Sequence, residues 1–326
     1  MRILSFILLL VASVSLLAQD VNVHVSPDVE TGIEGTTEFP TIQMALDHHP
    51  FPGRGGRVFI HIAPGVYHER LNITQNHPNI TLIGMGKGPE DVVITNRLNA
   101  KQAGGTFFTE TVEVDGTGFE ADNVTFENTA GNTGQAVAIV VRADRAVFKH
   151  CRLLGHQDTL FADYGRQYYV DSYIEGGVDF IFGDAAAVFD HDEIHSNGRG
   201  FLTAQSRTSA NQGTGYVIVN SRVTTDEDIS SIFLGRPWRP YARVVFMDTE
   251  LPATIDPAGW NSWGKASNEQ TAWFGEYRNS GQGALPAERV SWSHRLTAAQ
   301  ARQFLPRNFL SGKDHWNPVA AASKLP

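Results

Sequence analysis

A short pattern recurs about every 20 residues in the middle of the chain, and this repeat limits the folds that the sequence can adopt. Each unit is a short apolar strand flanked by Gly, Asn or Asp residues, which are typical of turns. The leading residues are separated by 22, 21, 20 and 29 positions and are Phe126, Phe148, Tyr169, Phe189 and Ile218. Units of this length cannot bury an apolar face alone, but they can when they are stacked in series. No stretch in this region sustains helical periodicity, so the repeat predicts an all-β solenoid, a parallel β-helix.

The interval before Ile218 is longer than the others and indicates an insertion. We place the insertion at residues 198–215 and expect it to protrude as a loop near the functional site. The composition does not shift along the chain and there is no low-complexity linker, so residues 19–326 are expected to form a single domain.

Short helices are expected before and after the solenoid. Residues 39–46 place apolar side chains at helical spacing, with Thr41 as a cap. Near the other end, Thr297 with Gln300 three positions later forms a capping-box pattern before residues 301–305.

Residues 1–18 have the pattern of a secretory signal peptide. One Arg precedes an apolar run from Ile3 to Ala18, which is too short to span a bilayer comfortably. A buried N-terminal helix is the alternative. We expect cleavage after Ala18 and a secreted protein, extracellular or periplasmic. The single cysteine, Cys151, allows no intrachain disulfide, so stability must come from core burial and hydrogen bonding.

The charge of the chain argues against one class of partner. With 26 Lys and Arg against 35 Asp and Glu, the formal net charge is -9 at pH 7, whereas a nucleic-acid-binding protein presents a basic patch. The same charge predicts weak attraction to a polyanion unless basic residues are concentrated in the site. We therefore expect no nucleic-acid partner. We also expect no membrane association and a monomer.

Four polar residues stand among apolar neighbours at the period of the repeat: Gln135, Gln157, Asp158 and Asp179. Gln157 lies 22 positions after Gln135 and 22 before Asp179, whereas Asp158 lies 21 before Asp179. Adjacent parallel strands are about 4.8 Å apart, so coils of this length bring two carboxylates and two amides onto one face. This face is the candidate functional site.

The two carboxylates can divide the work of nucleophile and acid when their surroundings differ. Arg236, stiffened by Pro237, is the best candidate to bind one carboxylate bidentately and keep it ionised. A like charge and nearby Phe rings are expected to raise the pKa of Asp158, which suits a general acid. These rings are Phe161, Phe180 and Phe182.

The amides of Gln135 and Gln157 can donate to an oxyanion that develops during acyl transfer. Two acids, two amides and an Arg are thus a plausible set for ester hydrolysis without serine. The sequence has no G-x-S-x-G and no H-E-x-x-H, so a nucleophile-elbow hydrolase and a zinc protease are unsupported. A glycosidase also uses two carboxylates, and each Asp alone could simply cap a turn.

The chain resembles the pectin methylesterases, carbohydrate esterase family 8, from about residue 39 to residue 316. Several motifs carry the resemblance in the order of the family. They are GVYHE at 65–69, GQAVA at 134–138, HQDTLF at 156–161, VDFIFG at 178–183 and LGRPW at 234–238. The resemblance implies a right-handed, single-stranded parallel β-helix that hydrolyses galacturonate methyl esters of homogalacturonan (pectin) to pectate and methanol. It also implies that the reaction uses neither a metal nor a cofactor.

The resemblance also implies roles for the candidate residues. Asp179 is expected to be the nucleophile, and Asp158 the acid that protonates methanol and then the base that activates water. Gln135 and Gln157 are expected to donate to the oxyanion, and Arg236 is expected to orient Asp179.

In the family, four aromatic positions line the sugar cleft, and here they are Trp238, Phe161, Phe182 and Trp260. Phe180 is expected to belong to the core instead.

Some positions depart from the pattern of the family. Plant members often have Cys where this chain has Ser172, Asp192 and Ser221, and Asn is usual where it has Asp184. The extra carboxylate at Asp184 is expected to influence how the cleft receives a galacturonate. The lack of a plant-type inhibitory pro-region suggests a bacterial secreted enzyme.

Other readings of the sequence remain open. A pectin lyase or a polygalacturonase shares the β-helix, but the acidic and basic motifs of those enzymes are not found. A catalytically inactive carbohydrate-binding β-helix is a second alternative, and a thioesterase or other acyl hydrolase is a third.

Overall fold

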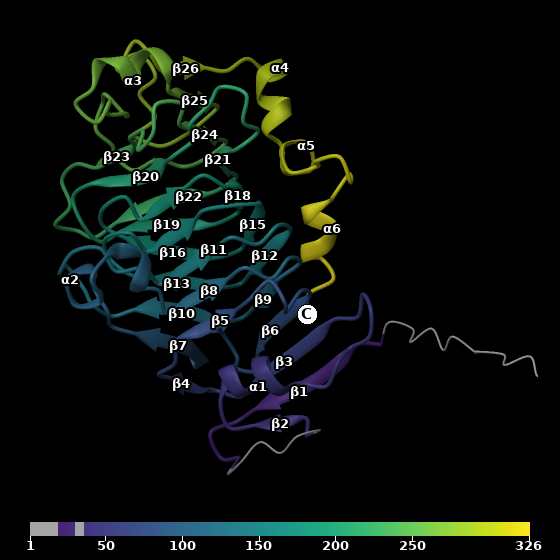
Figure 1. Ribbon diagram of the computed structural model, residues 1–326. Coiled ribbons are helices and arrows are strands. Elements are labelled where there is room, and N and C mark those ends of the chain that lie inside the picture. Colours follow the sequence, from purple (N-terminus) through teal and green to yellow (C-terminus); the bar gives the residue numbers. More distant parts are fainter. Residues whose placement is uncertain (1–18, 30–35) are drawn as a thin grey trace, which may run out of the picture.

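The computed structural model describes residues 19–29 and 36–326, which form a parallel β-helix of three sheets (Figure 1). Every pairing between its strands is parallel. The predicted β-helix is therefore confirmed. The proposed signal peptide, residues 1–18, lies outside the described residues.

The first sheet has twelve strands and runs the length of the molecule. In spatial order its strands are β2 (Glu38–Phe39), β1 (Val21–Val25), β3 (Val58–Ile62), β6 (Ile80–Gly84), β9 (Glu120–Asp122), β12 (Ala146–Lys149), β15 (Arg166–Val170), β18 (Ala186–Asp190), β21 (Gly215–Val219), β24 (Arg243–Met247), β25 (Trp273–Tyr277) and β26 (His294–Arg295).

The second and third sheets have seven strands each. The second comprises β4 (Gly65–Tyr67), β7 (Val92–Asn96), β10 (Thr125–Asn128), β13 (Arg152–Leu154), β16 (Tyr173–Gly176), β19 (Glu193–Ser196) and β22 (Arg222–Thr225). The third comprises β5 (Leu71–Ile73), β8 (Val112–Val114), β11 (Ile139–Val141), β14 (Leu160–Ala162), β17 (Ile181–Gly183), β20 (Phe201–Gln205) and β23 (Phe233–Gly235).

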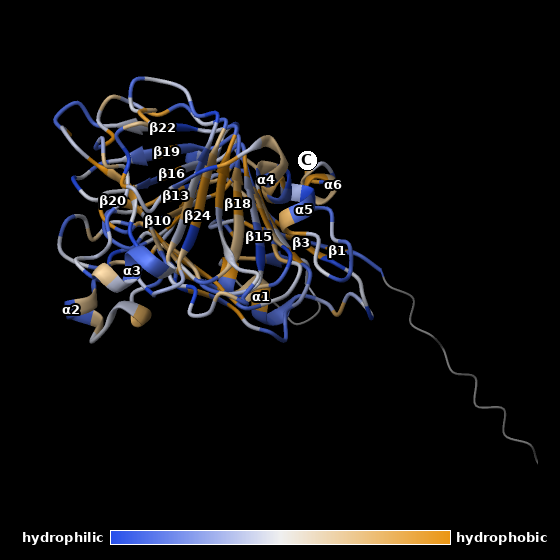
Figure 2. Cartoon of the chain, turned by 90° about the horizontal axis from the view of Figure 1, so that it is seen from above, coloured by the Kyte–Doolittle hydropathy of each residue, from blue (hydrophilic) through white to orange (hydrophobic). Residues whose placement is uncertain are grey.

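From β3 to β24, successive strands belong to the first, second and third sheets in turn, so each coil in this range adds one strand to each sheet. Equivalent residues of adjacent coils stack in the core. Phe148, Tyr169 and Phe189 are in register, and successive rings lie parallel with centroids 4.8 Å apart. Figure 2 shows apolar residues along strands such as β18 and β24, and their buried side chains form the core.

The turn between the first and second sheets explains the polar member of each repeat. One residue after each of several first-sheet strands has a left-handed backbone, and these residues include Asn123, His150, Asp171, His191 and Asn220 (φ 50 to 60°). Asn, Asp and His tolerate this conformation better than most side chains. The repeat in the sequence therefore reflects this tight turn.

One member of the predicted repeat is wrong. Phe126 lies in β10 of the second sheet, whereas the first-sheet partner of Phe148 is Ala121. Both sheets bury short apolar strands that end in Asn or similar residues, so the pattern alone does not distinguish them.

The predicted insertion is also smaller than expected. Residues 198–215 include β20, which is a regular strand of the third sheet. The protruding segment is therefore limited to residues 206–214.

Short helices flank the solenoid, as predicted. Thr41 caps α1 (Ile42–His48), and its side chain accepts a hydrogen bond from the Met44 backbone N–H. The capping box of Thr297 and Gln300 is present.

The C-terminal segment is broken into short helices, which pack along the first sheet in Figure 1. These are α4 (Ala298–Ala301), η3 (Arg302–Phe304), α5 (Pro306–Phe309) and α6 (Pro318–Ala322). The remaining short helices are η1 (Pro89–Asp91), α2 (Ala100–Ala103), η2 (Thr106–Phe108) and α3 (Ala266–Thr271). Among the described residues, no helix has the length and apolar character needed to cross a membrane.

Candidate active site

A cavity of about 380 Å³ opens on the outer face of the third sheet and contains all five predicted catalytic residues. Its lining residues are Thr106, Phe107, Gln135, Gln157, Asp158, Asp179, Phe182, Ala204, Arg236, Trp238 and Trp263. The floor comes from the coils of β11 to β20. One wall comes from η2, and another comes from the segments after β23. The cleft therefore lies across the stacked coils.

A larger hollow of about 930 Å³ lies beside the turns between the first and second sheets. Its lining includes His150, Asp171 and His191, and it contains none of the predicted catalytic residues. Size alone would favour this hollow, but the smaller cavity holds the convergent acids, amides and guanidinium.

The register of adjacent coils brings Asp158 beside Asp179. Gln157 pairs with Gln135 on one side and with Val178 on the other, so the next residue along, Asp158, is the neighbour of Asp179. The Asp158 backbone N–H donates to the Val178 carbonyl at 3.1 Å. Both Asp residues have left-handed backbones, with φ of 64° for Asp158 and 50° for Asp179. The predicted proximity of the four residues therefore arises because the two Asp residues are 21 positions apart and the two Gln residues are 22 positions apart, each about one coil.

Arg236 binds Asp179 through two parallel hydrogen bonds. Its Nε donates to Oδ1 of Asp179 at 2.9 Å and its Nη2 donates to Oδ2 at 2.5 Å. The Arg236 backbone N–H donates to the Thr203 carbonyl at 3.0 Å, which ties the residue to the third sheet. Bidentate pairs of this kind fix orientation as well as charge.

The surroundings of the two carboxyls separate their proton affinities. Burial, followed by the charge of Asp179, raises the pKa of Asp158 to about 8. Burial also raises the pKa of Asp179, whereas the hydrogen bonds and charge of Arg236 oppose this rise. From the sequence, Arg236 was expected to keep Asp179 ionised, but desolvation has a larger effect than Arg236 on the pKa of Asp179. Asp179 still loses its proton before Asp158, because only Asp179 is bonded to the guanidinium.

The amides of Gln135 and Gln157 face the cavity from adjacent coils. Within the part of the chain that the structure describes, neither side chain is engaged in a hydrogen bond. Their N–H groups are thus available to a ligand atom between them.

The aromatic residues form a stacked cluster next to the acids. Phe182 lines the cavity, and its ring lies parallel to that of Phe161 with centroids 4.5 Å apart. Phe161 is the partner of Phe182 in the adjacent strand and supports its ring from the side, but it is not among the residues that line the cavity. Trp238 contacts both rings edge-on and lines the cavity itself.

Trp260 corrects an expectation from the sequence. Its indole is 1% exposed and lies in the main core, stacked on Phe274 at 4.5 Å. It is therefore not a wall of the cleft. Trp263, three residues later, lines the cavity in its place.

The structure adds lining residues that the sequence did not indicate. Thr106 and Phe107 reach the cavity from η2, and the Phe107 ring lies 5.1 Å from that of Phe161. This segment lies outside the repeat, so the repeat period does not indicate that it reaches the site. In the sequence, the available indication was two Phe residues in succession, Phe107 and Phe108, and the structure shows that both are exposed.

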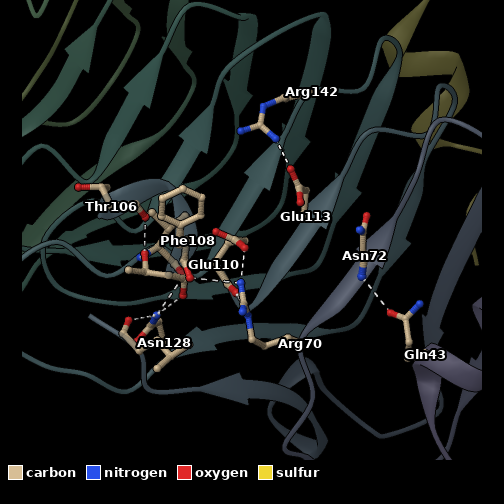
Figure 3. A network of polar contacts seen from close by, with 12 residues as sticks. Gln43, Arg70, Asn72, Thr106, Phe108, Glu110, Glu113, Asn128 and Arg142 are labelled. Atoms are coloured by element: carbon tan, nitrogen blue, oxygen red, sulfur yellow. Dashed lines mark hydrogen bonds and ion pairs between the residues drawn. The ribbon is translucent and has the colours of Figure 1, made fainter. Parts of the chain in front are cut away.

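A polar network supports the η2 wall (Figure 3). The Asn128 amide donates to the carbonyls of Leu98, Thr109 and Val137, each at 3.0 Å. The Thr109 hydroxyl then donates to the Thr106 carbonyl at 2.6 Å. The wall is therefore anchored to the coils beneath it.

Arg70 supports the same wall from its other side. Its guanidinium donates to the Phe108 carbonyl at 3.2 Å and to the Glu110 carbonyl at 3.0 Å. It also pairs with the Glu110 carboxylate.

Asp184, which was expected to influence how the cleft receives a galacturonate, is not among the residues that line the cavity. Its carboxylate accepts hydrogen bonds from Gln212 at 2.8 Å and from Thr214 at 2.7 Å. It anchors the protruding segment 206–214, which contributes no residue to the cavity lining.

Comparisons with known proteins agree on one family. The family model described as Pectinesterase matches residues 28–313. The chain is 41% identical to "Pectinesterase 31" of Arabidopsis thaliana over 293 residues, which cover 86% of this chain and 92% of that protein. It also matches longer plant proteins, and spans 51% of "Pectinesterase 1" of Citrus sinensis at 39% identity.

Solved structures show the same similarity. Pectin methylesterase from carrot superposes with a TM-score of 0.84 at 34% identity, covering 94% of this chain and 97% of that one. A pectin methylesterase in complex with a hexasaccharide superposes with a TM-score of 0.75 at 30% identity, covering 91% and 98%.

Proposed function

Since this chain belongs to the pectinesterase family, the carboxylic ester hydrolases of pectin (EC 3.1.1.11), we propose that its five clustered polar residues carry out the hydrolysis. The activity is that of a pectin methylesterase, which acts on pectin. The assignment of Asp179, Asp158, Gln135, Gln157 and Arg236 to its steps is our proposal.

The first step is attack by Asp179 on the ester carbonyl carbon. The carboxylate oxygen forms a bond to that carbon, and the carbonyl oxygen takes up the electron pair as an oxyanion. The amides of Gln135 and Gln157 donate to this oxyanion, which stabilises it most when charge has developed. As the intermediate collapses, methoxide leaves with the proton of Asp158, giving methanol and an acyl-enzyme anhydride.

The second step returns the enzyme to its starting state. Asp158, now ionised, takes a proton from water, and the resulting hydroxide attacks the acyl carbon. Asp158 is protonated again, and the bond to Asp179 breaks, which restores the Asp179 carboxylate and releases the free carboxylic acid of the galacturonate residue. This acid then loses its proton to water. Each atom and proton taken up in the first step is thereby accounted for.

One observation carries this assignment. The two adjacent carboxyls occupy equivalent positions, but Arg236 is hydrogen-bonded only to Asp179. Burial and the charge of Asp179 raise the pKa of Asp158 to about 8. Near neutral pH this difference leaves Asp179 as the ionised nucleophile and Asp158 as the proton donor.

The cleft also suits the substrate class. We propose that methylesterified homogalacturonan binds across the coils, with pyranose rings against Phe182 and Trp238 and with Phe161 holding Phe182 in place. The complex of a related pectin methylesterase with a hexasaccharide supports binding of an oligosaccharide in such a cleft. We further propose that residues 1–18 direct secretion and are removed, that residues 19–326 are the mature domain, and that it acts as a monomer.

The test is incubation of the purified protein with highly methylated pectin in the presence of a chelator. Methanol, new reducing ends and unsaturated products are measured in parallel, and we expect methanol alone. Asp179→Ala should abolish methanol release. Asp171→Ala is a matched control, because Asp171 also occupies a left-handed turn, φ 51°, but lies outside the cavity.

Two results would overturn the assignment. Near-normal methanol release by Asp179→Ala would remove Asp179 as the nucleophile. New reducing ends or unsaturation without methanol would mean cleavage of the polysaccharide backbone by a lyase or a glycosidase.

A further inference from the structure

The guanidinium of Arg236 lies between two aromatic rings. Its Cζ is 3.9 Å from the ring centroid of Phe201 and 3.7 Å from that of Trp263. We propose that Phe201 and Trp263 are positioning residues for the esterase reaction, which hold the Arg236 guanidinium so that Asp179 stays bound bidentately. The inference rests on the proposed role of Asp179 as nucleophile.

Phe201 holds both partners of this ion pair. Its ring lies against the Arg236 guanidinium, and its backbone carbonyl accepts a hydrogen bond from the Asp179 N–H at 2.8 Å. A single residue at the start of β20 thus sets the position of the carboxylate and the plane of the guanidinium together. Phe201 is not part of the cavity lining, so it acts through Arg236 rather than on the substrate.

Trp263 covers the guanidinium from the side of the cleft. Its backbone is left-handed, φ 59°, which is unusual for a bulky side chain. The Trp263 N–H donates to Oδ1 of Asn261 at 2.8 Å, and this bond closes the turn. The chain therefore adopts an unfavourable backbone conformation at the one Trp that both lines the cavity and contacts Arg236.

Two rings restrain the guanidinium more than the ion pair alone. Aromatic faces attract a cation and prefer its planar face to lie against them, especially where water is excluded. Arg236 then cannot swing toward the other carboxyl, Asp158, which lies beside Asp179 in the adjacent coil. This restraint maintains the difference between the two acids on which the reaction depends.

The decisive variant is Phe201→Leu, which removes the ring without changing the cavity lining. We expect kcat to fall by roughly three- to thirtyfold, the range that a desolvated cation–π contact supports. KM should change by less than about twofold, because the substrate touches neither Phe201 nor its replacement. The acid limb of the pH profile of kcat/KM should move to higher pH, because Asp179 is then less well paired. Phe201→Tyr keeps the aromatic face and should restore the wild-type values.

Two controls separate positioning from packing. Phe233 stacks on Phe201 with ring centroids 5.3 Å apart, so Phe233→Leu loosens the same stack while keeping the Phe201 and Trp263 rings against Arg236, and it should leave the acid limb unchanged. The second control is a double-mutant cycle with Arg236→Lys, since a residue that acts only through Arg236 should have no further effect on kcat in that background. The cycle is measured on folded protein, and the melting temperature of each variant is compared with that of the wild type.

The outcomes are distinct. An equal loss of kcat and an equal shift of the acid limb in Phe201→Leu and Phe233→Leu would overturn the positioning role, as would additive losses of kcat in the cycle. Unchanged kcat and pH profile in Phe201→Leu, with inactive Asp179→Ala, would overturn this inference alone. Activity in Asp179→Ala would instead overturn the proposed function.

Discussion

Asp158 and Asp179 occupy equivalent positions in adjacent coils, and both have left-handed backbones, yet only Asp179 is bonded to Arg236. The sheet brings the two carboxyls together, and the guanidinium makes them different. This asymmetry permits one carboxyl to act as a nucleophile while the other supplies a proton.

The asymmetry predicts a bell-shaped dependence of kcat/KM on pH. At low pH Asp179 is protonated and cannot attack, and its raised pKa places the rising limb above the usual range of an Asp. At high pH Asp158 is ionised and cannot donate, so activity should fall near pH 8. Methanol release from about pH 4 to 9, corrected for spontaneous ester hydrolysis, measures both limbs.

A carboxyl outside the cavity provides the control for this profile. Burial also raises the pKa of Asp184, but its carboxylate anchors the segment 206–214. Asp184→Asn should leave both limbs in place. Activity that rises continuously through pH 9 in the wild type would contradict the role of Asp158 as the acid.

Arg236→Lys tests the geometry of the ion pair while keeping its charge. Lys cannot bind a carboxylate bidentately, and its ammonium does not stack as a plane between Phe201 and Trp263. We expect kcat to fall by roughly 30-fold or more and the free energy of unfolding to fall by about 1–3 kcal/mol. Steady-state kinetics and urea denaturation measure the two effects, and wild-type kcat in this variant would show that charge alone is sufficient.

Much of the site was predictable because stacking converts constant spacing in the sequence into proximity in space. Gln135, Gln157, Asp158 and Asp179 recur at the coil length, so the β-helix places them on one face whatever the details of each turn. Arg236 lies outside this spacing, and its position beside Asp179 depends on β23 being in register with β20. The pairing of Arg236 with a carboxylate was therefore predicted from the bidentate geometry of the guanidinium rather than from the repeat.

The walls of the cleft were less predictable, because they come from segments that do not follow the repeat. Trp260 and Trp263 stand three residues apart in the same turn, and the left-handed backbone of Trp263 directs one ring to the cleft while the other enters the core. Aromatic identity does not distinguish these two environments. Phe107 likewise depends on contacts of η2 with distant coils.

Gln157→Ala tests the proposed oxyanion donors. The Gln157 amide should interact most strongly with the charged intermediate and weakly with the neutral ester. We expect kcat to fall by about 10²–10³ with little change in KM. Gln157→Glu replaces the donor by an acceptor next to two carboxyls and should be at least as inactive. A rise in KM at unchanged kcat would instead assign Gln157 to binding of the substrate.

The final prediction concerns a buried carboxyl away from the cleft. Asp192 is 1% exposed, and although its Oδ1 accepts a hydrogen bond from the Ser172 N–H at 2.8 Å, its Oδ2 has no partner among the described residues. Burial raises the pKa of Asp192 well above its usual value. The folded protein therefore retains a proton that the unfolded chain loses, so the cost to stability grows as the pH rises above about 3.9.

Asp192→Ser should remove this cost. Ser172 and Ser221 occupy the equivalent positions of adjacent coils, and their hydroxyls donate to the carbonyls two residues earlier, Val170 at 3.0 Å and Val219 at 2.7 Å. The new hydroxyl can repeat this bond and still accept from the Ser172 N–H. We expect the free energy of unfolding at pH 7 to rise by about 1–3 kcal/mol, the usual cost of an unsatisfied buried polar group, with a smaller gain at pH 4. Denaturation at both pH values measures the difference, and an equal gain at both would show that packing, rather than ionisation, is responsible.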